Sequence, residues 1–442
     1  MNQEFMKTKN VLPLVLTMSY PMAISMAVNA LYNIVDSFFV SQISDKAMTA
    51  LSLLFPVQNF SHSVAVGIAI GINAVVAFYM GQGSPGEADK AATNGIVLSA
   101  LHGIILTAGC IAIMPWFMDR FTDDQNIVSF GLSYTGILFI FAPMDCMAIA
   151  MEKTFQAAGR MKTTMLSLAA GCIINIILDP LLIFGIGPFP ELGIRGAAVA
   201  TGIGQTLPLM IYAVLYKTKP IPVRFRKKYI RPEMYMMKRL YSIGNAGTLN
   251  LALPSVQVSV LNAILASYSA GYIFILGVYY KLQTFLYLSV NGVVQGIRPL
   301  VGYNYGAGEH GRVREIVRIS IILAAIIMTA GTAVCQLIPE ILMGIFTQDE
   351  AVVRAGASAL RIISGGFIIS SISVILSGAL EGLGKGTESL VISLIRYIVF
   401  IIPAAFCMSC IMGAGGVWHA FWITEVAAAA ISCCIYRRAV RN

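Results

Sequence analysis

The run "LSLAAGCIINIILDPLLIFGIG", residues 166–187, decides the fold class of this chain. It is long and apolar enough to cross a bilayer, since a membrane-spanning helix needs about 20 such residues. Its middle nevertheless holds Asn175, Asp179 and Pro180. An acid at the centre of a membrane helix costs about 2.5–3.5 kcal/mol on insertion scales, so a retained one marks a candidate functional site.

The composition indicates that the whole chain is a membrane protein. Of its 442 residues, 57% are hydrophobic and only 12% are charged, whereas a soluble domain is about 25% charged. The apolar runs are also far longer than the roughly 10-residue alternating strands of a membrane barrel. We therefore predict an all-α polytopic membrane protein. Its twelve expected spans are residues 11–40, 50–80, 95–118, 127–152, 163–187, 196–216, 241–267, 273–303, 317–338, 355–380, 389–411 and 416–436.

The net charge of +9 follows from topology and does not indicate a nucleic-acid partner, because the Lys and Arg residues lie in short loops between apolar runs. The positive-inside rule places both termini in the cytoplasm, together with the basic loop 217–240. That charge also favours contact with the anionic lipids of the inner leaflet. No cleavage site follows the first apolar run, so we expect no removable signal peptide and a location in the bacterial cytoplasmic membrane.

The chain repeats itself at a constant offset of 225 residues. "GIN" at 71–73 and "GQG" at 81–83 match "GIR" at 296–298 and "GAG" at 306–308, and Gly159 matches Gly384. We expect an N-terminal lobe (1–216), a basic cytoplasmic linker (217–240) and a C-terminal lobe (241–442). Six spans in each lobe return the chain to its starting side, so the repeats are predicted to be parallel. Two-lobed repeats of this kind belong mostly to transporters.

Polar residues from three predicted spans fall at similar depth in the N-terminal lobe. Asp36, Asp179 and the pair Ala197 and Thr201 lie in the outer half of the membrane, within roughly 6 Å of depth at 1.5 Å per residue. Asn175 and Asp179 are four residues apart and share a helix face. Their oxygens, with a carbonyl freed by the proline at 180, suit Na⁺ or a proton shared by two carboxylates that cannot both stay ionised. The alternative is that Asp179 only caps a kinked helix or pairs with a distant arginine.

The C-terminal lobe has no matching acids. The positions equivalent to Asp36, Asn175, Asp179 and Thr201 hold apolar residues, so the cation site is expected in the N-terminal lobe alone. These positions are Leu261, Phe400, Ala404 and Val426.

Other intramembrane charges give weaker indications. Asp145 and Lys281 are candidates for the substrate path, although Asp145 could equally be a structural acid and Lys281 could extend to the interface. Arg396 and Glu425 are expected to pair with each other. The eight cysteines, including the "CxxC" at 407–410, lie in apolar segments and are interpreted as packing residues. No metal-ligand cluster or nucleophile–base motif accompanies them, so we expect no enzyme activity and no cofactor beyond a coupling ion.

The constellation resembles the multidrug and toxic compound extrusion (MATE) family over essentially the whole chain. The resemblance rests on Pro21 and Asp36 in the first span, "NIILDPLLIFG" in the fifth and "GIRGAAVATGIGQ" after it. In the DinF-like branch, the resemblance implies a cation site at Asp36, Asn175, Asp179 and Thr201, with Ala197 as a backbone contact. The NorM-like branch also uses acids in helices 7 and 10. Span 7 here has none, and span 10 has none before Glu381 at its inner end.

The resemblance implies a secondary active multidrug antiporter, which exports amphipathic, often cationic compounds in exchange for H⁺ or Na⁺ by alternating access. We expect a monomer with small-molecule drug substrates. One alternative is a lipid-linked oligosaccharide flippase of a related fold, which needs a cationic cavity. Lys281, Arg298, Arg361 and Arg396 are too dispersed in depth to form one. A major facilitator carrier is a second alternative, but the basic loop that such carriers have between spans 2 and 3 is missing.

Overall fold

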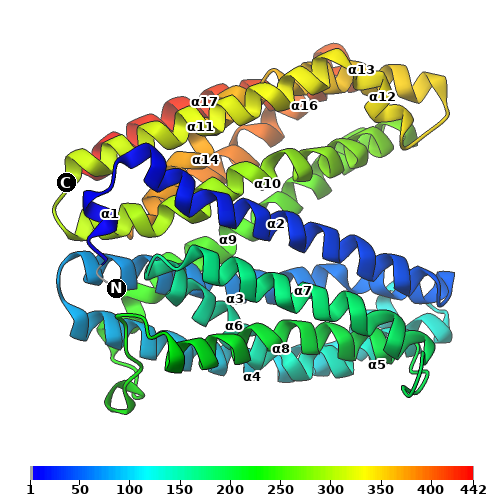
Figure 1. Ribbon diagram of the computed structural model, residues 1–442. Helices are drawn as coiled ribbons and strands as arrows, with labels where there is room; N and C mark the ends of the chain where they lie inside the picture. Colours follow the sequence, from blue (N-terminus) through cyan, green and yellow to red (C-terminus); the bar gives the residue numbers. More distant parts are fainter. Residues whose placement is uncertain (1–2, 442) are drawn as a thin grey trace. The chain divides into compact units, whose positions relative to one another are not determined.

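The computed structural model describes residues 3–441, and every regular element within that range is a helix. Eleven helices there are long and apolar enough to cross a membrane, or twelve if the bent pair α13 (Glu350–Ser364) and α14 (Phe367–Gly382) counts as one span. Figure 1 shows the long helices running beside one another within each part of the chain. The prediction of an all-α polytopic membrane protein is confirmed.

The chain divides into two compact units. Unit 1 contains Ile24–Thr248, and unit 2 contains Glu4–Ala23 and Leu249–Asn442. Helices α2 (Val11–Ser41) and α9 (Met234–Ala266) therefore contribute to both units. The other helices of unit 1 are α3 (Asp45–Gly81), α4 (Pro85–Phe121), α5 (Gln125–Leu138), η1 (Phe139–Phe141), α6 (Ala142–Ala157), α7 (Met161–Phe184), α8 (Ile194–Thr218) and η2 (Lys227–Tyr229).

Unit 2 contains the remaining helices. Besides α13 and α14, it holds α1 (Phe5–Thr8), α10 (Ala270–Gly306), α11 (His310–Leu337), α12 (Pro339–Gly344), α15 (Gly386–Leu394), η3 (Ile395–Val399), α16 (Ile401–Met412) and α17 (Ala414–Arg441).

The sequence repeat is also a repeat of helix boundaries. α3 begins at Asp45 and α10 at Ala270, which are 225 residues apart. The turns after these two helices place Gly83 at φ 73° and Gly308 at φ 77°. Both angles lie in the left-handed region that glycine adopts without the strain of a side chain. The matching glycine motifs of the sequence therefore form the same turn in both units.

Two predicted spans are broken at equivalent places. The span predicted at 127–152 changes to a 3₁₀ turn at Phe139–Phe141, and the span predicted at 355–380 bends by 52° between α13 and α14. Pro143 follows the first break and has no N–H to donate, whereas Gly365 and Gly366 form the second. A further irregularity, the π-helical turn η3, interrupts the eleventh predicted span and has no counterpart in α7.

Each unit packs a glycine-lined helix against the first part of α2 or α9. In unit 1, a Cβ added to Gly67 would lie 2.6 Å from the backbone nitrogen of Thr248 on α9. In unit 2, a Cβ added to Gly292 would lie 2.6 Å from the Cα of Ala23 on α2. Small residues at such places let two membrane helices approach closely. Both pairs are related by the offset of 225 residues, so the two units use the same packing.

The linker predicted at 217–240 is ordered on the end of α4. The Asp89 carboxylate, only 2% exposed, accepts hydrogen bonds from the Arg224 backbone N–H and the Arg226 Nε, both at 2.7 Å. The buried Asn94 side chain donates to the Tyr229 carbonyl at 2.6 Å. This part of the linker is therefore held by buried polar groups of unit 1.

Candidate functional site

Three helices of unit 1 bring the predicted polar residues together. The Asn175 Nδ2 on α7 lies 3.5 Å from Asp179 Oδ1 on the same helix and 3.5 Å from Thr201 Oγ1 on α8. Asp179 is fully buried, and the Asp36 side chain on α2 is 8% exposed. The carboxylates of Asp36 and Asp179 are close enough to interact electrostatically. The i, i+4 spacing on α7 thus does place the amide and the acid on one buried face.

The buried oxygens of this cluster are poorly satisfied. Among the described residues, Asp36 Oδ1, Asn175 Oδ1 and Asp179 Oδ2 are buried without a hydrogen-bond donor. The two contacts that Asn175 does make are long, at 3.5 Å, where a hydrogen bond is already weak. A buried acceptor without a donor costs about 1–3 kcal/mol. Three such oxygens from two helices form an acceptor set of the kind that a proton or a hard cation satisfies.

Three residues beside this cluster were not predicted. The hydroxyls of Tyr32 on α2 and Tyr134 on α5 approach the Thr201 side chain and interact electrostatically with both acids. Gln58 on α3 lies close to Tyr134. Tyr32 precedes Asp36 by four residues, so the helix-face argument that joined the two α7 residues was available for it. Nothing in the sequence pointed to Tyr134, whose place depends on the packing of α5 against α8.

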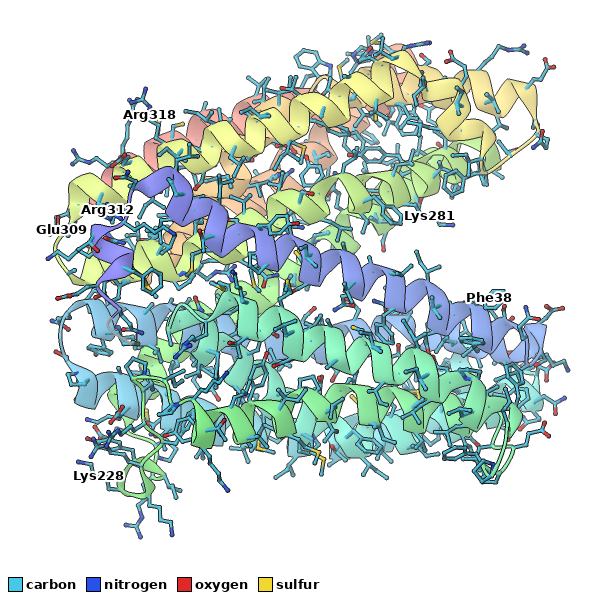
Figure 2. The ribbon with its side chains drawn as sticks, in the orientation of Figure 1. Phe38, Lys228, Lys281, Glu309, Arg312 and Arg318 are labelled. Atoms are coloured by element: carbon cyan, nitrogen blue, oxygen red, sulfur yellow. The ribbon has the colours of Figure 1, made fainter. Side chains whose placement is uncertain are left out.

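The remaining predicted site residues lie elsewhere. Ala197 is completely buried in an apolar cluster of unit 1, and its role as a backbone ligand stays a prediction. Asp145 is half-buried in the first turn of α6 and interacts electrostatically with Glu152 on the same helix. Lys281, labelled in Figure 2, is exposed on α10, with its Nζ 5.7 Å from the centroid of the Phe346 ring. The structure does not bring Asp145 or Lys281 into the Asp36–Asp179 cluster.

In unit 2, the charges of Arg396 and Glu425 form an ion pair with each other. The Arg396 Nε on η3 donates to the Glu425 Oε1 on α17 at 2.7 Å. The guanidinium also lies over the rings of Tyr287 and Tyr397, at 5.9 and 5.3 Å. Cation–π contacts of this kind add to the stability of a buried guanidinium. The expected pairing of Arg396 with Glu425 is thus what the structure shows.

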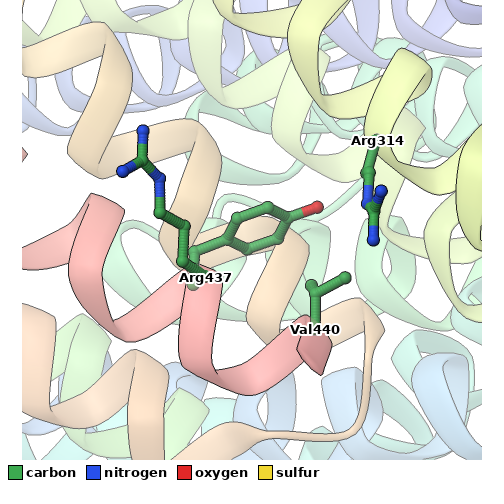
Figure 3. A pocket seen from close by; sticks show the side chains of 4 residues that line it. Arg314, Arg437 and Val440 are labelled. Atoms are coloured by element: carbon green, nitrogen blue, oxygen red, sulfur yellow. The ribbon is translucent and has the colours of Figure 1, made fainter. Parts of the chain in front are cut away.

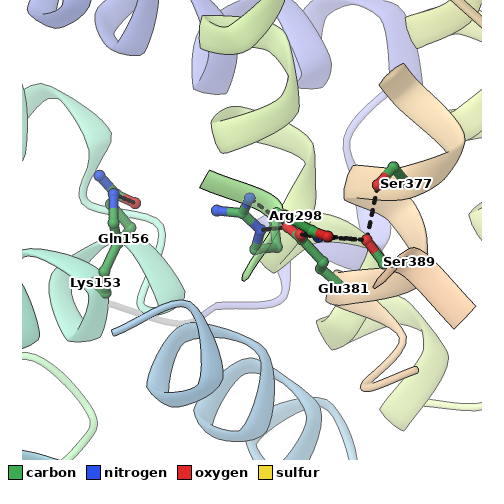
Figure 4. A network of polar contacts seen from close by, with 7 residues as sticks. Lys153, Gln156, Arg298, Ser377, Glu381 and Ser389 are labelled. Atoms are coloured by element: carbon green, nitrogen blue, oxygen red, sulfur yellow. Dashed lines mark hydrogen bonds and ion pairs between the residues drawn. The ribbon is translucent and has the colours of Figure 1, made fainter. Parts of the chain in front are cut away.

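A second, buried ion pair of unit 2 joins α10 and α14. The Arg298 Nη2 donates to Glu381 Oε2 at 2.6 Å, and the two side chains are 7% and 6% exposed. The other oxygen, Oε1, accepts from Asn250 Nδ2 at 2.9 Å and from Ser389 Oγ at 3.3 Å. Figure 4 shows Glu381 between Arg298 and Ser389, with Ser377 joined to Ser389. The flippase alternative would need Lys281 and three arginines to bind an anion. The three arginines each have a carboxylate partner: Arg298 with Glu381, Arg361 with Glu340, and Arg396 with Glu425.

The cluster in unit 1 presents oxygen atoms of two carboxylates and an amide. Within the part of the chain that the structure describes, no three side chains of His, Cys, Asp or Glu gather at one point. Two carboxylates with an amide and a hydroxyl instead offer only oxygen ligands, which suit protons and hard cations.

Comparison with known proteins places the chain in a family. The family model MatE matches residues 21–181 and 250–407. The chain is 24% identical over 408 residues to the multidrug export protein MepA of Staphylococcus aureus (strain NCTC 8325 / PS 47), covering 92% of this chain and 89% of that protein. It is 25% identical over 417 residues to the protein of the same name from Staphylococcus saprophyticus, with the same two coverages.

Solved structures show the same fold. A crystal structure of MATE in complex with MaL6 superposes with a TM-score of 0.92 at 21% identity, covering 100% of this chain and 99% of the other. A MOP superfamily transporter from Pyrococcus furiosus gives a TM-score of 0.92 at 21% identity, covering 100% and 98%. The family model matches most of the chain and extends over both repeats. The chain therefore belongs to the MatE family, whose members are transporters and not enzymes.

Proposed function

We propose that this protein is a secondary active multidrug efflux antiporter, which exports amphipathic, often cationic compounds in exchange for H⁺ or Na⁺. The observation that carries the proposal is the set of buried, donor-free oxygens on Asp36, Asn175 and Asp179. A site of this kind is costly when empty and is relieved when a cation arrives. Binding and release of that cation therefore supply a free-energy difference that can be coupled to a change of shape.

The multidrug substrate class is taken from the relatives. The two staphylococcal proteins are named multidrug export proteins, and the alignment with them covers nearly the whole chain. We propose that the chain is organised as an N-terminal lobe (1–216), the linker 217–240 and a C-terminal lobe (241–442), and that drugs follow a path through the protein. Asp145 and Lys281 are proposed to contribute to that path, and alternating access of the lobes exchanges drug for cation.

We propose that the coupling cation is handled by the N-terminal lobe alone, as in the DinF-like branch. The positions of unit 2 that correspond to the acids hold Leu261 and Ala404. Glu381, the nearest acid of the tenth predicted span, is already engaged by Arg298. The C-terminal lobe is therefore without a free acidic pair of the kind that the NorM-like branch uses.

The orientation and location follow from the charge distribution. We propose that both termini and the linker face the cytoplasm, because the Lys and Arg residues concentrate in the segments on that side. The proposed location is the cytoplasmic membrane of a bacterium, in agreement with the bacterial relatives. We propose that the protein works as a monomer.

No observation favours the flippase alternative. A carrier of lipid-linked diphosphates needs cationic side chains that are available to the substrate. The arginines at 298, 361 and 396 are each engaged by a carboxylate at 2.6–2.9 Å, so their charges are largely compensated.

The test is transport by proteoliposomes that contain the purified protein. Uptake or release of a fluorescent organic cation is measured under a Na⁺ gradient and an H⁺ gradient, imposed separately. We expect one of the two gradients to drive transport, and we expect Asp36→Asn and Asp179→Asn to reduce it to the level of empty vesicles. Asp45→Asn, an acid at the first turn of α3, is the matched control and should transport normally. Full gradient-driven transport by both site variants would rule out the coupling site.

A further inference from the structure

A pocket lies between two helix ends of unit 2, away from the acidic cluster. It has a volume of about 320 Å³ and is lined by Arg314, Tyr436, Arg437 and Val440. Arg314 belongs to the start of α11, and the other three belong to the end of α17. Figure 3 shows Arg314 on one side of the pocket and Arg437 on the other, with Val440 between them at the edge.

The polar groups of this pocket point to an anion. Among the described residues, neither Arg314 nor Arg437 has a carboxylate partner within ion-pair distance. The Tyr436 hydroxyl is buried and has no hydrogen-bond partner in that part of the chain, and it interacts electrostatically with Arg314. Two guanidinium groups and one free O–H offer several donors and strong positive charge. Arginine donors of this geometry match the oxygens of a phosphate group.

The exposed face of α11 that leads away from the pocket suits an acyl chain. On α11, the exposed positions Arg314, Arg318, Ile322 and Ile326 succeed one another every four residues, so one strip changes from basic to apolar. Figure 2 shows Arg318 near the same end of unit 2 as Glu309. A lipid in this position would have its headgroup at the arginines and its hydrocarbon chain along the isoleucines.

The α17 helix carries a matching strip. Its exposed positions Trp422, Val426, Ala430 and Cys434 also recur every four residues, and they end at the Arg437 turn. Helix α14 packs against both α11 and α17, and the Lys385 Nζ after α14 donates to the Ala439 carbonyl at 2.7 Å. Helix α14 therefore packs against both helices that carry an apolar strip, and Lys385 ties its end to the helix end that lines the pocket.

We propose that this pocket binds the phosphate group of an anionic phospholipid of the cytoplasmic leaflet. Arg314 and Arg437 supply the charge, and the Tyr436 hydroxyl donates a hydrogen bond to a phosphate oxygen. Basic pockets between membrane helices on the cytoplasmic side are a recognised form of headgroup site. A volume near 320 Å³ is at the small end of the range for ligand pockets, which fits a headgroup and not a whole lipid. The choice of lipid as the source rests on the orientation proposed above.

The test uses the purified full-length protein and native mass spectrometry. The probe is dioctanoyl-phosphatidylglycerol, compared with dioctanoyl-phosphatidylcholine and with glycerol 3-phosphate. Arg314→Gln with Arg437→Gln should weaken phosphatidylglycerol binding about 25-fold, because each cation near an anionic lipid contributes about fivefold. Tyr436→Phe, which keeps the ring, should weaken it about tenfold, since it removes one hydrogen bond to a charged group.

The matched control removes two charges outside the pocket. Lys227→Gln with Lys228→Gln changes two exposed linker residues and should leave the high-affinity phosphatidylglycerol adduct unchanged. All variants should melt at the wild-type temperature without added lipid, because the pocket side chains make no ion pair within the described chain. Equal phosphatidylglycerol affinity in the wild type and the Arg314/Arg437 variant would overturn the site. Equally tight binding of phosphatidylcholine would overturn the anionic selectivity. Glycerol 3-phosphate displacing the lipid at equal concentration would overturn the lipid and assign the pocket to a soluble phosphate.

Discussion

Breaking the Arg298–Glu381 pair should destabilise the protein more than replacing both of its members. Both side chains are nearly buried, at 7% and 6% exposure, and the guanidinium donates from Nη2 at 2.6 Å and from Nε at 3.1 Å to one carboxylate oxygen. Glu381→Gln leaves the arginine charge buried without a counter-charge. Arg298→Asn leaves the carboxylate in the same condition. Each single substitution should therefore cost about 3–5 kcal/mol of folding free energy.

The sequence repeat supplies the design of the double variant. Residues 225 positions earlier are Asn73 and Gln156, so Arg298→Asn with Glu381→Gln gives unit 2 the neutral amides of unit 1. The new amide at 381 can keep contact with Asn250, which donates to Glu381 Oε1 at 2.9 Å. The double variant should lose only about 1–2 kcal/mol, because no uncompensated charge remains.

Unfolding of the purified variants in sodium dodecyl sulfate measures these differences, with thermal melting in mild detergent as a second readout. The double variant should be more stable than either single variant, and it should still export an organic cation. The reasoning is refuted if Glu381→Gln is as stable as the wild type, or if the double variant is less stable than both single variants. Loss of export in a stable double variant would show that the Arg298 charge serves transport directly.

Two further outcomes follow from local geometry. Gly296→Ala would place a Cβ 2.6 Å from the Ser19 Oγ, so it should cost about 1–3 kcal/mol through overpacking, measured by detergent unfolding. In Gly277→Ala the new Cβ meets no described atom within 4 Å, so stability should stay equal or rise, and equal losses in the two variants would contradict the close packing. At a helix connection, a hydrogen bond from Lys46 lowers the pKa of Asp124 below its ordinary value of 3.8. Because the folded-state pKa is depressed, this contribution is present above about pH 4 and is lost as the pH falls further. Asp124→Asn should therefore flatten the fall of the melting temperature between pH 5 and pH 3, and an unchanged slope would show that the pair does not contribute.

Much of the helical fold follows from hydropathy, because a bilayer requires long apolar helices whatever their partners are. The breaks within the predicted spans were not predicted, although local signals for them are present in the sequence. Pro143 and the adjacent glycines at 365–366 are local signals for the breaks near them, and they were available in the sequence. Pro403 is likewise a local signal for the π-helical turn Ile395–Val399, because a proline has no N–H and its ring clashes with the carbonyl four residues earlier.

The candidate site shows a division between local and tertiary information. Asn175 and Asp179 could be joined from their spacing on one helix, and Thr201 and Asp36 from their depth. Tyr134 could not be found, because a tyrosine in an apolar helix has no distinguishing spacing until α5 is packed. The sequence also did not indicate that the first part of α2 packs in unit 2 and the first part of α9 in unit 1. The repeats are alike, so Gly67 and Gly292 carry no indication of which copy of the first helix they contact.

That allocation of helix segments to the two units has a consequence for any attempt to divide the protein. The glycine face of α3 is covered by residues 234–248, which follow the linker, and the glycine face of α10 is covered by residues that precede residue 24. A chain cut in the linker therefore gives two fragments, neither of which carries all the segments of one compact unit. Each fragment would expose a glycine-lined groove that only the other fragment can fill. Co-expression of the two halves should therefore restore a folded protein. Either half produced alone should be degraded.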